Sequence, residues 1–350
     1  MTNVLHAKFK LNGSYFTDKE LYDIASGFVN DKAEYLKEAG TFLQNWLDDK
    51  DYVIVQTSGT TGKPKLINVK KQAMVNSALA SGMFFDLQSG NSALCCLPVK
   101  YIAGKMMLVR AMVLGLEIDL VEPKSNPLEK NDRKYDFVAM VPLQVENSLD
   151  KLNQIGQLLI GGAKVNLGLG AKIMATKCKA YETYSMTETV THVAAKRVGN
   201  ETFTVLPNVT ISTDNRGCLI IDAPELNSDK IITNDLITII SETEFIWKGR
   251  VDNVINSGGI KLFPEAIEEK ISKNITQRFF VGGIPDEKLG EKVVLVVEGE
   301  ECEIDQGIFE TLTKYEKPKS VFFITEFLET ETGKIKRKEI LKQLAIKNPA

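Results

Sequence analysis

The chain has 350 residues, of which 43% are hydrophobic and 25% are charged, a balance typical of a globular protein with two domains. Its 43 basic and 46 acidic residues leave a formal net charge of −3, which gives no indication of a nucleic-acid partner. With only two histidines, His6 and His192, a His-rich zinc site is excluded. A Ser-His-Asp triad would have to use His192, and no Gly-x-Ser-x-Gly elbow accompanies it.

Three features predict a cytoplasmic location. The five cysteines form no Cys-x-x-Cys pair and are odd in number, which is typical of reduced thiols. The start of the chain carries no charged-then-apolar secretion signal. The most apolar stretch, residues 106–116, is too short to cross a bilayer and contains Arg110, so we expect no membrane insertion.

Strands and helices are expected to alternate along the chain, which favours an α/β fold. Short β-rich runs predict strands at 52–56, 137–142, 158–162, 218–222 and 293–298. Apolar residues three and four apart predict helices over 72–83 and 106–114, and Pro264 opens a helix farther along. The composition changes near residues 248–250, so we expect a main domain at 1–248 and a small domain at 249–350.

The strongest local signal is the segment TSGTTGKPK at residues 57–65, which lies between two apolar runs. Glycines let successive backbone N–H groups turn toward one anion, hydroxyls add donors and lysines add charge, so the segment predicts a phosphate-binding loop. It is not a Walker A loop, because its glycines are too close together and Pro64 stands where a Mg²⁺-binding Ser or Thr belongs. The alternative is a polar hairpin turn. The candidate phosphate-binding residues are Thr57, Ser58, Gly59, Thr60, Thr61, Gly62, Lys63 and Lys65.

Five motifs, in order, resemble those of the adenylate-forming enzymes, the superfamily of acyl-CoA synthetases, amino-acid adenylation domains and luciferases. The first is the loop at 57–65, and the second, YSMTE at 184–188, resembles Y-G-x-T-E. TNDL at 233–236 resembles T-G-D-L, residues 248–268 resemble the hinge motif, and TGKI at 332–335 resembles S-G-K-I. The resemblance implies a large N-terminal α/β domain, shortened at its start, and a small mobile α+β C-terminal domain.

The family reaction has two steps. A carboxylate attacks the α-phosphate of ATP to give an acyl-adenylate and pyrophosphate, and a thiol, usually that of CoA, then displaces AMP. The resemblance therefore implies ATP and Mg²⁺ as cofactors and CoA as co-substrate. Because the first step joins two anions, positioning and charge stabilisation should dominate catalysis.

By resemblance, three motifs build the nucleotide site. Glu188 would bind Mg²⁺, a hard cation that suits carboxylates, and Thr187 would hydrogen-bond the α-phosphate. Asp235 would accept hydrogen bonds from the ribose hydroxyls, with support from Arg250. The adenine slot would be formed by Gly161, Gly162, Ala163 and Tyr184. The alternatives are a solvated acid for Glu188, core packing for Tyr184 and a turn-forming residue for Asp235.

Lys334 is the expected catalytic residue of the adenylation step. The family places a lysine here that bridges the carboxylate and the α-phosphate, whereas the lysines that follow it are interpreted as a solvated basic run. Because Lys334 belongs to the small domain, that domain must close for the first step and rotate away for the second, about the hinge residue Asp252. Gly258 and Gly259 would then line the path of CoA.

Residues 97–104, LPVKYIAG, resemble the family segment L-P-x-F-H-x-x-G, and Arg110 follows six residues after its glycine. The o-succinylbenzoate–CoA ligases of menaquinone biosynthesis carry an arginine at that spacing, so the chain resembles this branch of the superfamily. Their substrate is a small aromatic dicarboxylic acid. Arg110 would hold its second carboxylate as a bidentate clamp, with Lys105 as a second candidate. The alternative is an arginine that extends to the protein surface.

Three departures from the family pattern bear on the acid pocket. Ser185 replaces the usual glycine beside the acyl carbonyl, and Tyr101 replaces a histidine that gates the pocket in other members. Only 56 residues precede the phosphate loop, so part of the N-terminal domain is expected to be absent. Its packing surface would be covered either by residues 14–50 or by another subunit, which leaves a homo-oligomer open.

Two other functions stay open. One is a ligase for another small aryl acid or an amino-acid-adenylating enzyme, although no clear aspartate for an α-ammonium is visible. The other is a non-catalytic nucleotide-binding protein of the same fold, against which Lys334, Glu188 and Asp235 argue together. We favour an ATP-dependent acid–CoA ligase that acts on o-succinylbenzoate.

Overall fold

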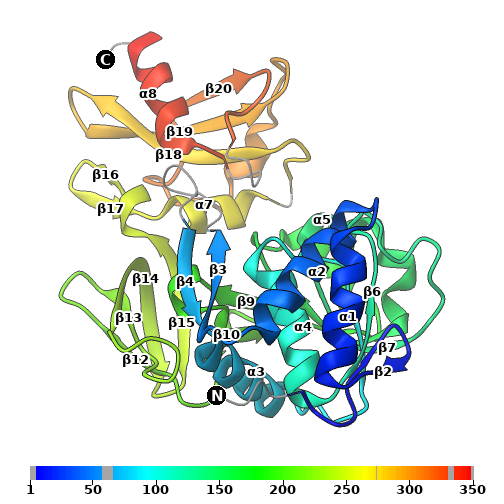
Figure 1. Cartoon of the computed structure of the whole chain (residues 1–350). Helices are drawn as coiled ribbons and strands as arrows, with labels where there is room; N and C mark the ends of the chain where they lie inside the picture. Colours follow the sequence, from blue (N-terminus) through cyan, green and yellow to red (C-terminus); the bar gives the residue numbers. More distant parts are fainter. Residues whose placement is uncertain (1–4, 57–65, 273, 330–334, 348–350) are drawn as a thin grey trace.

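A computed structural model of the chain describes residues 5–56, 66–272, 274–329 and 335–347 (Figure 1). Over these residues, thirteen strands form a large sheet, five form a small sheet and two form a hairpin. The large sheet contains β1 (Lys10–Leu11), β2 (Ser14–Tyr15), β5 (Ser92–Cys95), β6 (Glu117–Leu120), β7 (Tyr135–Met140), β8 (Ile155–Ile160), β9 (Lys179–Ser185), β10 (His192–Arg197), β11 (Thr202–Val205), β12 (Thr210–Thr213), β13 (Cys218–Asp222), β14 (Ile231–Ser241) and β15 (Glu244–Arg250). The small sheet contains β16 (Ile255–Ser257), β17 (Ile260–Leu262), β18 (Phe279–Asp286), β19 (Gly290–Glu298) and β20 (Ser320–Ile324), and the hairpin pairs β3 (Tyr52–Gln56) with β4 (Leu66–Lys70).

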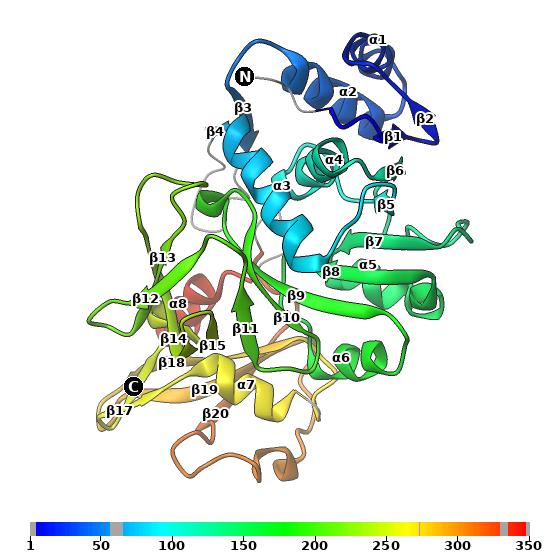
Figure 2. The same ribbon diagram turned by 90° about the horizontal axis from the view of Figure 1, so that it is seen from below.

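Helices cover both faces of the middle of the large sheet (Figure 2). The α-helices are α1 (Asp18–Val29), α2 (Glu34–Leu47), α3 (Lys71–Phe85), α4 (Ile102–Leu114), α5 (Pro142–Asn147), α6 (Leu167–Met174), α7 (Pro264–Ile271) and α8 (Arg337–Lys347), and the 3-10 turns are η1 (Leu149–Gln154), η2 (Thr187–Thr189), η3 (Val251–Asn253) and η4 (Gln306–Phe309). Phe137 on β7 packs into the core that holds α3 and α4, and the next residue, Val138, packs into the core that holds α5 and α6. Burial on both faces explains why residues 137–140 of this strand are all apolar.

The middle of the large sheet is parallel. β6, β5, β7, β8 and β9 are hydrogen-bonded neighbours in that order and run in one direction. The carboxyl ends of parallel strands meet at one edge, which is where open α/β sheets bind ligands. The loops after β5, β7, β8 and β9 therefore meet there, although residues 97–101 and 185–188 are far apart in the sequence. Beyond β9 the pairing turns antiparallel and continues through β10, β11, β15, β14, β13 and β12.

Residues 10–47 complete the other end of the large sheet. β1 pairs in parallel with β6, and α2 places Phe42, Leu43 and Trp46 in the core that also holds Met106 of α4. Figure 2 shows α1 and α2 beside α4, on the side of the molecule away from the small sheet. Residues 14–50, one of the two expected coverings, thus pack at this end of the sheet.

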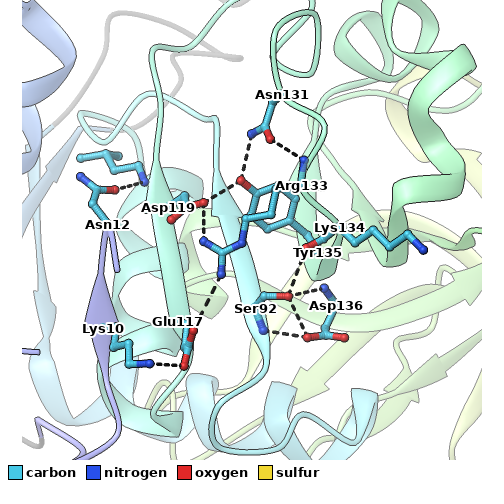
Figure 3. A network of polar contacts seen from close by, with 11 residues as sticks. Lys10, Asn12, Ser92, Glu117, Asp119, Asn131, Arg133, Lys134, Tyr135 and Asp136 are labelled. Atoms are coloured by element: carbon cyan, nitrogen blue, oxygen red, sulfur yellow. Dashed lines mark hydrogen bonds and ion pairs between the residues drawn. The ribbon is translucent and has the colours of Figure 1, made fainter. Parts of the chain in front are cut away.

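A polar network fixes the order of the strands at this end of the sheet (Figure 3). Lys10 on β1 donates to Glu117 on β6 at 2.6 Å. Asp119, also on β6, accepts hydrogen bonds from Arg133 at 2.8 Å and from the hydroxyl of Tyr135 at 2.7 Å. Burial raises the pKa of Tyr135 to about 12, so its hydroxyl stays a donor. Because a one-residue slip would turn these side chains to the opposite face, the network favours one register.

The small sheet follows the large one through η3 (Figure 1). α7 and α8 contact its strand β18, and Ile267 and Ile271 on α7 lie in the core, four residues apart as the pattern predicts. Arg337 at the start of α8 donates two hydrogen bonds to Glu268 on α7, at 2.7 and 3.0 Å. Burial raises the pKa of Glu268, and the bidentate pair with Arg337 opposes that rise. This pair ties the beginning of α8 to α7.

The predicted α/β fold is confirmed. The strands expected at 52–56 and 218–222 have the predicted bounds, and α7 begins at Pro264 as expected. α4 begins at Ile102 rather than at residue 106. The small residues at 103 and 104 contribute little to the apolar periodicity from which the helix was predicted, so the prediction began too late. All five cysteines are free thiols. No helix within the described ranges is long and apolar enough to cross a membrane.

The packing of α1 against α2 depends on Gly40, and Gly27 provides a matched control. A Cβ at residue 40 would lie 2.5 Å from the Ala25 carbonyl oxygen, whereas a Cβ at residue 27 would meet nothing within 4 Å. We expect Gly40→Ala to lower the free energy of unfolding by about 1–3 kcal/mol through overpacking. Gly27→Ala should raise it by up to about 1 kcal/mol through helix propensity. Chemical denaturation checks both values, and equal effects of the two substitutions would contradict this packing.

Candidate active site

A cleft opens at the carboxyl ends of the parallel strands, and residues of β14, β15 and α7 form its other walls. The cleft therefore lies between loops of the large sheet, the strands β14 and β15 before η3, and the helix α7 after η3. The residues predicted from the sequence that line it are Tyr101, Gly162, Ala163, Tyr184, Ser185, Thr187, Glu188, Asp235 and Arg250. The described residues that were predicted but do not border it are Lys105, Arg110, Gly161, Asp252, Gly258 and Gly259.

The predicted phosphate loop at residues 57–65 and Lys334 lie outside the described residues. Their roles therefore stay predictions. Gln56, which precedes the first segment, and Glu329, which precedes the second, both line the cleft. The described chain thus reaches the cleft immediately before the phosphate loop and shortly before Lys334.

A strained turn between β9 and β10 presents Thr187 and Glu188 to the cleft. Val190 has φ = 65° and ψ = −55°, a backbone conformation that branched residues rarely adopt. The Thr191 N–H donates to the Thr189 carbonyl oxygen at 2.7 Å across this residue. The Thr189 hydroxyl lies 2.6 Å from the Thr191 carbonyl oxygen and braces the same turn. Such strain persists only where the surroundings hold it, and it is typical of functional sites.

Glu188 is suited to bind Mg²⁺ together with phosphate oxygens. Its side chain is exposed at the cleft, and its backbone carbonyl accepts a hydrogen bond from Asn227 at 3.3 Å. Within the part of the chain that the structure describes, no group of three or more His, Cys, Asp or Glu side chains could hold a metal ion. Mg²⁺ is usually bound through one or two carboxylates and the phosphates of a substrate, and Glu188 is a single carboxylate exposed at the cleft.

Asp235 is a fixed hydrogen-bond acceptor in the wall of the cleft. Its Oδ2 accepts from the Tyr184 hydroxyl at 2.7 Å, and its Oδ1 accepts from Trp247 Nε1 at 3.1 Å. Arg250 is its register partner on β15. Burial raises the pKa of Tyr184, so the hydroxyl remains a donor. Because Asp235 lies within β14, the alternative of a turn-forming residue is excluded, and each carboxylate oxygen keeps a lone pair for a ligand hydroxyl.

The small residues after β8 leave room at the end of the strand. Gly162 has φ = +86°, a conformation that favours glycine, and it lines the cleft with Ala163. A Cβ on Gly161 would lie 3.0 Å from Thr183 Oγ1 on the neighbouring strand. Gly161 therefore serves the close approach of two strands, and the other two residues face the cleft.

The loop after β5 carries Tyr101 to the cleft and is held from behind by α4. Tyr101 is the N-cap residue of this helix, and a Cβ on Gly104 would lie 2.4 Å from a loop carbonyl oxygen. The Lys105 ammonium donates to the carbonyl oxygens of Val99 and Lys100 at 2.7 and 2.8 Å, and burial lowers its pKa to about 8. The structure therefore favours a loop-supporting role for Lys105 over the predicted contact with the acid.

Arg110 on α4 is only 2% exposed, which excludes the alternative of a surface position. Its Nε donates to Ser81 Oγ at 3.2 Å, and its Nη2 lies 3.3 Å from both Thr191 Oγ1 and His192 Nδ1. Its Nη1 faces the sulfur of Met107 at 3.8 Å. Burial lowers its pKa to about 10, and among the described residues no carboxylate pairs with it. Because Thr191 lines the cleft, the guanidinium lies one hydrogen bond behind the cleft wall.

Asp252, the predicted hinge residue, lies in η3 between the two sheets. Its carboxylate accepts hydrogen bonds from Arg250 at 3.0 Å and from Asn234 at 3.2 Å, both on the large sheet. Gly258 and Gly259 form the turn between β16 and β17. In this arrangement they are not part of the cleft.

Trp247, which hydrogen-bonds Asp235, and Ser81, Thr191 and His192, which contact Arg110, were not predicted as site residues from the sequence. Trp247 lies on a strand and Ser81 on a helix, and neither belongs to a motif that would identify it. Thr191 and His192 come shortly after the YSMTE motif. That proximity is the signal that could have identified them.

Residues 15–230 match the family of AMP-binding enzymes. An acyl-CoA synthetase (AMP-forming)/AMP-acid ligase II-like protein from Dyadobacter fermentans is 38% identical, over 92% of this chain and 98% of that protein, with a TM-score of 0.62. The o-succinylbenzoate coenzyme A synthetase of Bacillus subtilis, solved in complex with ATP and magnesium ion, is 18% identical over 86% of this chain and 74% of that protein, with a TM-score of 0.73. This second likeness shows a shared fold.

Curated relatives include the 2-succinylbenzoate–CoA ligase of Lactococcus lactis, 26% identical over 84% of this chain and 71% of that protein. The ligase of the same name from Haemophilus influenzae is 24% identical over 93% of this chain and 78% of its own length. The chain belongs to the AMP-binding enzyme family. It is an AMP-forming acid–CoA ligase, so the reaction class predicted from the five motifs is confirmed. The family uses ATP and Mg²⁺.

His192 should make stability depend on pH. Burial lowers its pKa well below 6.5, and the nearby Arg110 lowers it further, so the folded protein holds a neutral ring. The unfolded chain takes up a proton at His192 as the pH falls below 6.5, and the folded protein does not. The free energy of unfolding should therefore fall in acid, by up to about 1.4 kcal/mol per pH unit from this residue.

Chemical denaturation of the wild type and His192→Asn at about pH 7.5 and about pH 5 measures this contribution. The stability of the variant should decline less between the two pH values, because asparagine does not titrate. Other groups contribute equally to both proteins and cancel in the difference. An identical decline in the two proteins would contradict a neutral, buried His192.

Proposed function

We propose that this ligase activates o-succinylbenzoate and transfers the acyl group to CoA, a step of menaquinone biosynthesis. The observation that carries the proposal is the Arg110 guanidinium, which is buried behind the cleft wall with neutral partners. A buried charge without a counter-charge is costly, and a ligand carboxylate would remove that cost. A dicarboxylic acid supplies such a group after its other carboxylate has reacted, whereas a monocarboxylic acid does not. The curated relatives named for this substrate, at 24–26% identity, give independent support.

For the adenylation step, we assign the residues that line the cleft to the nucleotide. Glu188 would hold Mg²⁺, which offsets phosphate charge, and Thr187 would bind the α-phosphate. Asp235, oriented by Tyr184 and supported by Arg250, would bind the ribose hydroxyls. Residues 57–65 would bind the β- and γ-phosphates. Glu188, Thr187, Tyr184, Asp235 and Arg250 line the same cleft, which supports the assignments made to them.

For the transfer to CoA, we propose that residues 1–248 and 249–350 are separate domains that rotate about Asp252. The rotation would withdraw Lys334 and bring Gly258 and Gly259 to the thiol path. It would break the ion pair between Lys164, in the loop after β8, and Glu269 on α7, whose atoms lie 3.0 Å apart. Exposed ion pairs of this kind contribute only about 0–1 kcal/mol, so such a contact does not prevent the rotation.

The substrate is tested by comparing o-succinylbenzoate with 4-oxo-4-phenylbutanoate, the same acid without the carboxylate on its ring. With ATP, Mg²⁺ and CoA, we expect the first to give AMP and a thioester. The second should show a kcat/KM lower by about a hundredfold or more, because Arg110 then keeps no counter-charge. Chromatography of the thioester and AMP release measure both. A thioester with another aryl acid but not with o-succinylbenzoate would refute the substrate, and aminoacyl-adenylate formation would favour the amino-acid alternative.

Lys334→Ala should separate the two half-reactions. Without the lysine that stabilises charge between the carboxylate and the α-phosphate, pyrophosphate release from ATP and the acid should slow by about 10²–10³-fold. Thioester formation from the synthetic acyl-adenylate should change far less, since the lysine is withdrawn in that step. Lys336→Ala is the matched control, because Lys336 is exposed and its ammonium forms an ion pair with Glu339 one turn along. Equal loss in both half-reactions, or equal loss in both variants, would overturn the assignment.

A further inference from the structure

The contacts around His192 determine which ring nitrogen carries its proton. Nδ1 lies 3.3 Å from Arg110 Nη2, and a guanidinium can only donate, so Nδ1 offers its lone pair. The proton of the neutral ring is therefore on Nε2, which donates to Ser81 Oγ at 3.3 Å. Ser81 Oγ in turn donates to the Ser77 carbonyl oxygen at 2.9 Å. The ring also packs edge-on against Phe85, so its orientation is set by α3.

These contacts hold Nε and Nη2 of the Arg110 guanidinium and leave Nη1 without a strong acceptor. Ser81 holds Nε, and His192 with Thr191 holds Nη2, whereas Nη1 faces only a thioether sulfur, which is a weak acceptor. Because the Nε hydrogen and both Nη2 hydrogens are donated, a ligand carboxylate would accept from Nη1. That geometry is useful for selection only if the planar group is held in one orientation.

The absence of charge on His192 matters as much as its position. A cation there would repel Arg110, and a carboxylate would neutralise it and remove its attraction for an anionic ligand. A neutral acceptor orients the guanidinium and leaves its full charge for the acid. All the acceptors of Arg110 in the described structure share this property.

We infer that His192 is a positioning residue that sets the preference for acids with a second carboxylate, by orienting Arg110 from behind without neutralising it. This inference rests on the proposed function, because it requires that Arg110 receives the second carboxylate. His192 itself need not touch the acid. It is 3% exposed, and the residue beside it, Thr191, is the one that lines the cleft.

The test measures the ratio of kcat/KM for o-succinylbenzoate to that for 4-oxo-4-phenylbutanoate in three variants. His192→Asn keeps a neutral acceptor and should rescue the ratio to within about threefold of the wild type. His192→Asp introduces a side chain with nearly the shape of asparagine but with a negative charge. His192→Leu removes the hydrogen-bond acceptor. Both should lower the ratio at least tenfold, which is about 1.4 kcal/mol of selectivity. A residue that only filled space would not separate asparagine from aspartate.

Two further variants complete the test: one substitution that should not impair folding, and one control. Ser81→Ala, a change that helices tolerate, removes the acceptor of both His192 Nε2 and Arg110 Nε and should also lower the ratio at least tenfold. The Ser77 hydroxyl is buried with no hydrogen-bond partner in the described structure, and the network uses only the Ser77 backbone carbonyl. Ser77→Ala should therefore leave the ratio within about twofold of the wild type.

The outcomes distinguish this inference from the proposed function. If the wild type does not prefer the dicarboxylic acid, the proposed function fails and the inference fails with it. If the wild type prefers it and His192→Asp keeps the full ratio, the inference is wrong and the proposed function stands. If the aspartate and leucine variants do not fold, an unchanged ratio in Ser81→Ala overturns the inference.

Discussion

The parallel pairing of β6, β5, β7, β8 and β9 is the constraint on which the site depends. Parallel strands end at the same edge of a sheet, so the loops that follow four of them meet although they are spread over almost a hundred residues. Tyr101, Gly162 and Glu188 share one cleft for this reason. The polar network of Lys10, Glu117 and Asp119 holds the far end of the same sheet in register, and so supports the cleft from a distance.

Two buried cations lie on α4, beside and behind the loop that carries Tyr101 to the cleft. Lys105 and Arg110 lie on one helix and are both buried, but their surroundings differ. Loop carbonyl oxygens accept the hydrogen bonds of Lys105, which makes it part of the scaffold. Arg110 meets only neutral side chains, so its charge is left for a ligand. Under the proposed function, the preference for an acid with a second carboxylate would follow from this difference between Lys105 and Arg110.

The connection between the two sheets is short and polar and contains Asp252, the proposed hinge residue. On one side, Asp252 accepts hydrogen bonds from Arg250 and Asn234 on the large sheet. On the other, Arg337 and Glu268 form a bidentate pair that ties α8 to α7 within the small sheet's layer. The Arg337–Glu268 pair is partly buried, whereas the ion pair between Lys164 and Glu269 across the cleft is exposed, which is compatible with the proposed rotation.

The sequence by itself determined the superfamily, the reaction class and most elements, because these rest on short contiguous motifs and local apolar patterns. Most of the described residues that it singled out for the site, nine of fifteen, line the cleft, since each belongs to one of those motifs. Only the tertiary structure decided that Lys105 donates its hydrogen bonds to loop carbonyl oxygens and that Trp247 orients Asp235. It also decided that Ser81 and His192 contact Arg110. Burial and hydrogen-bond partners depend on neighbours in space, and these residues are brought together from distant parts of the chain by strand order.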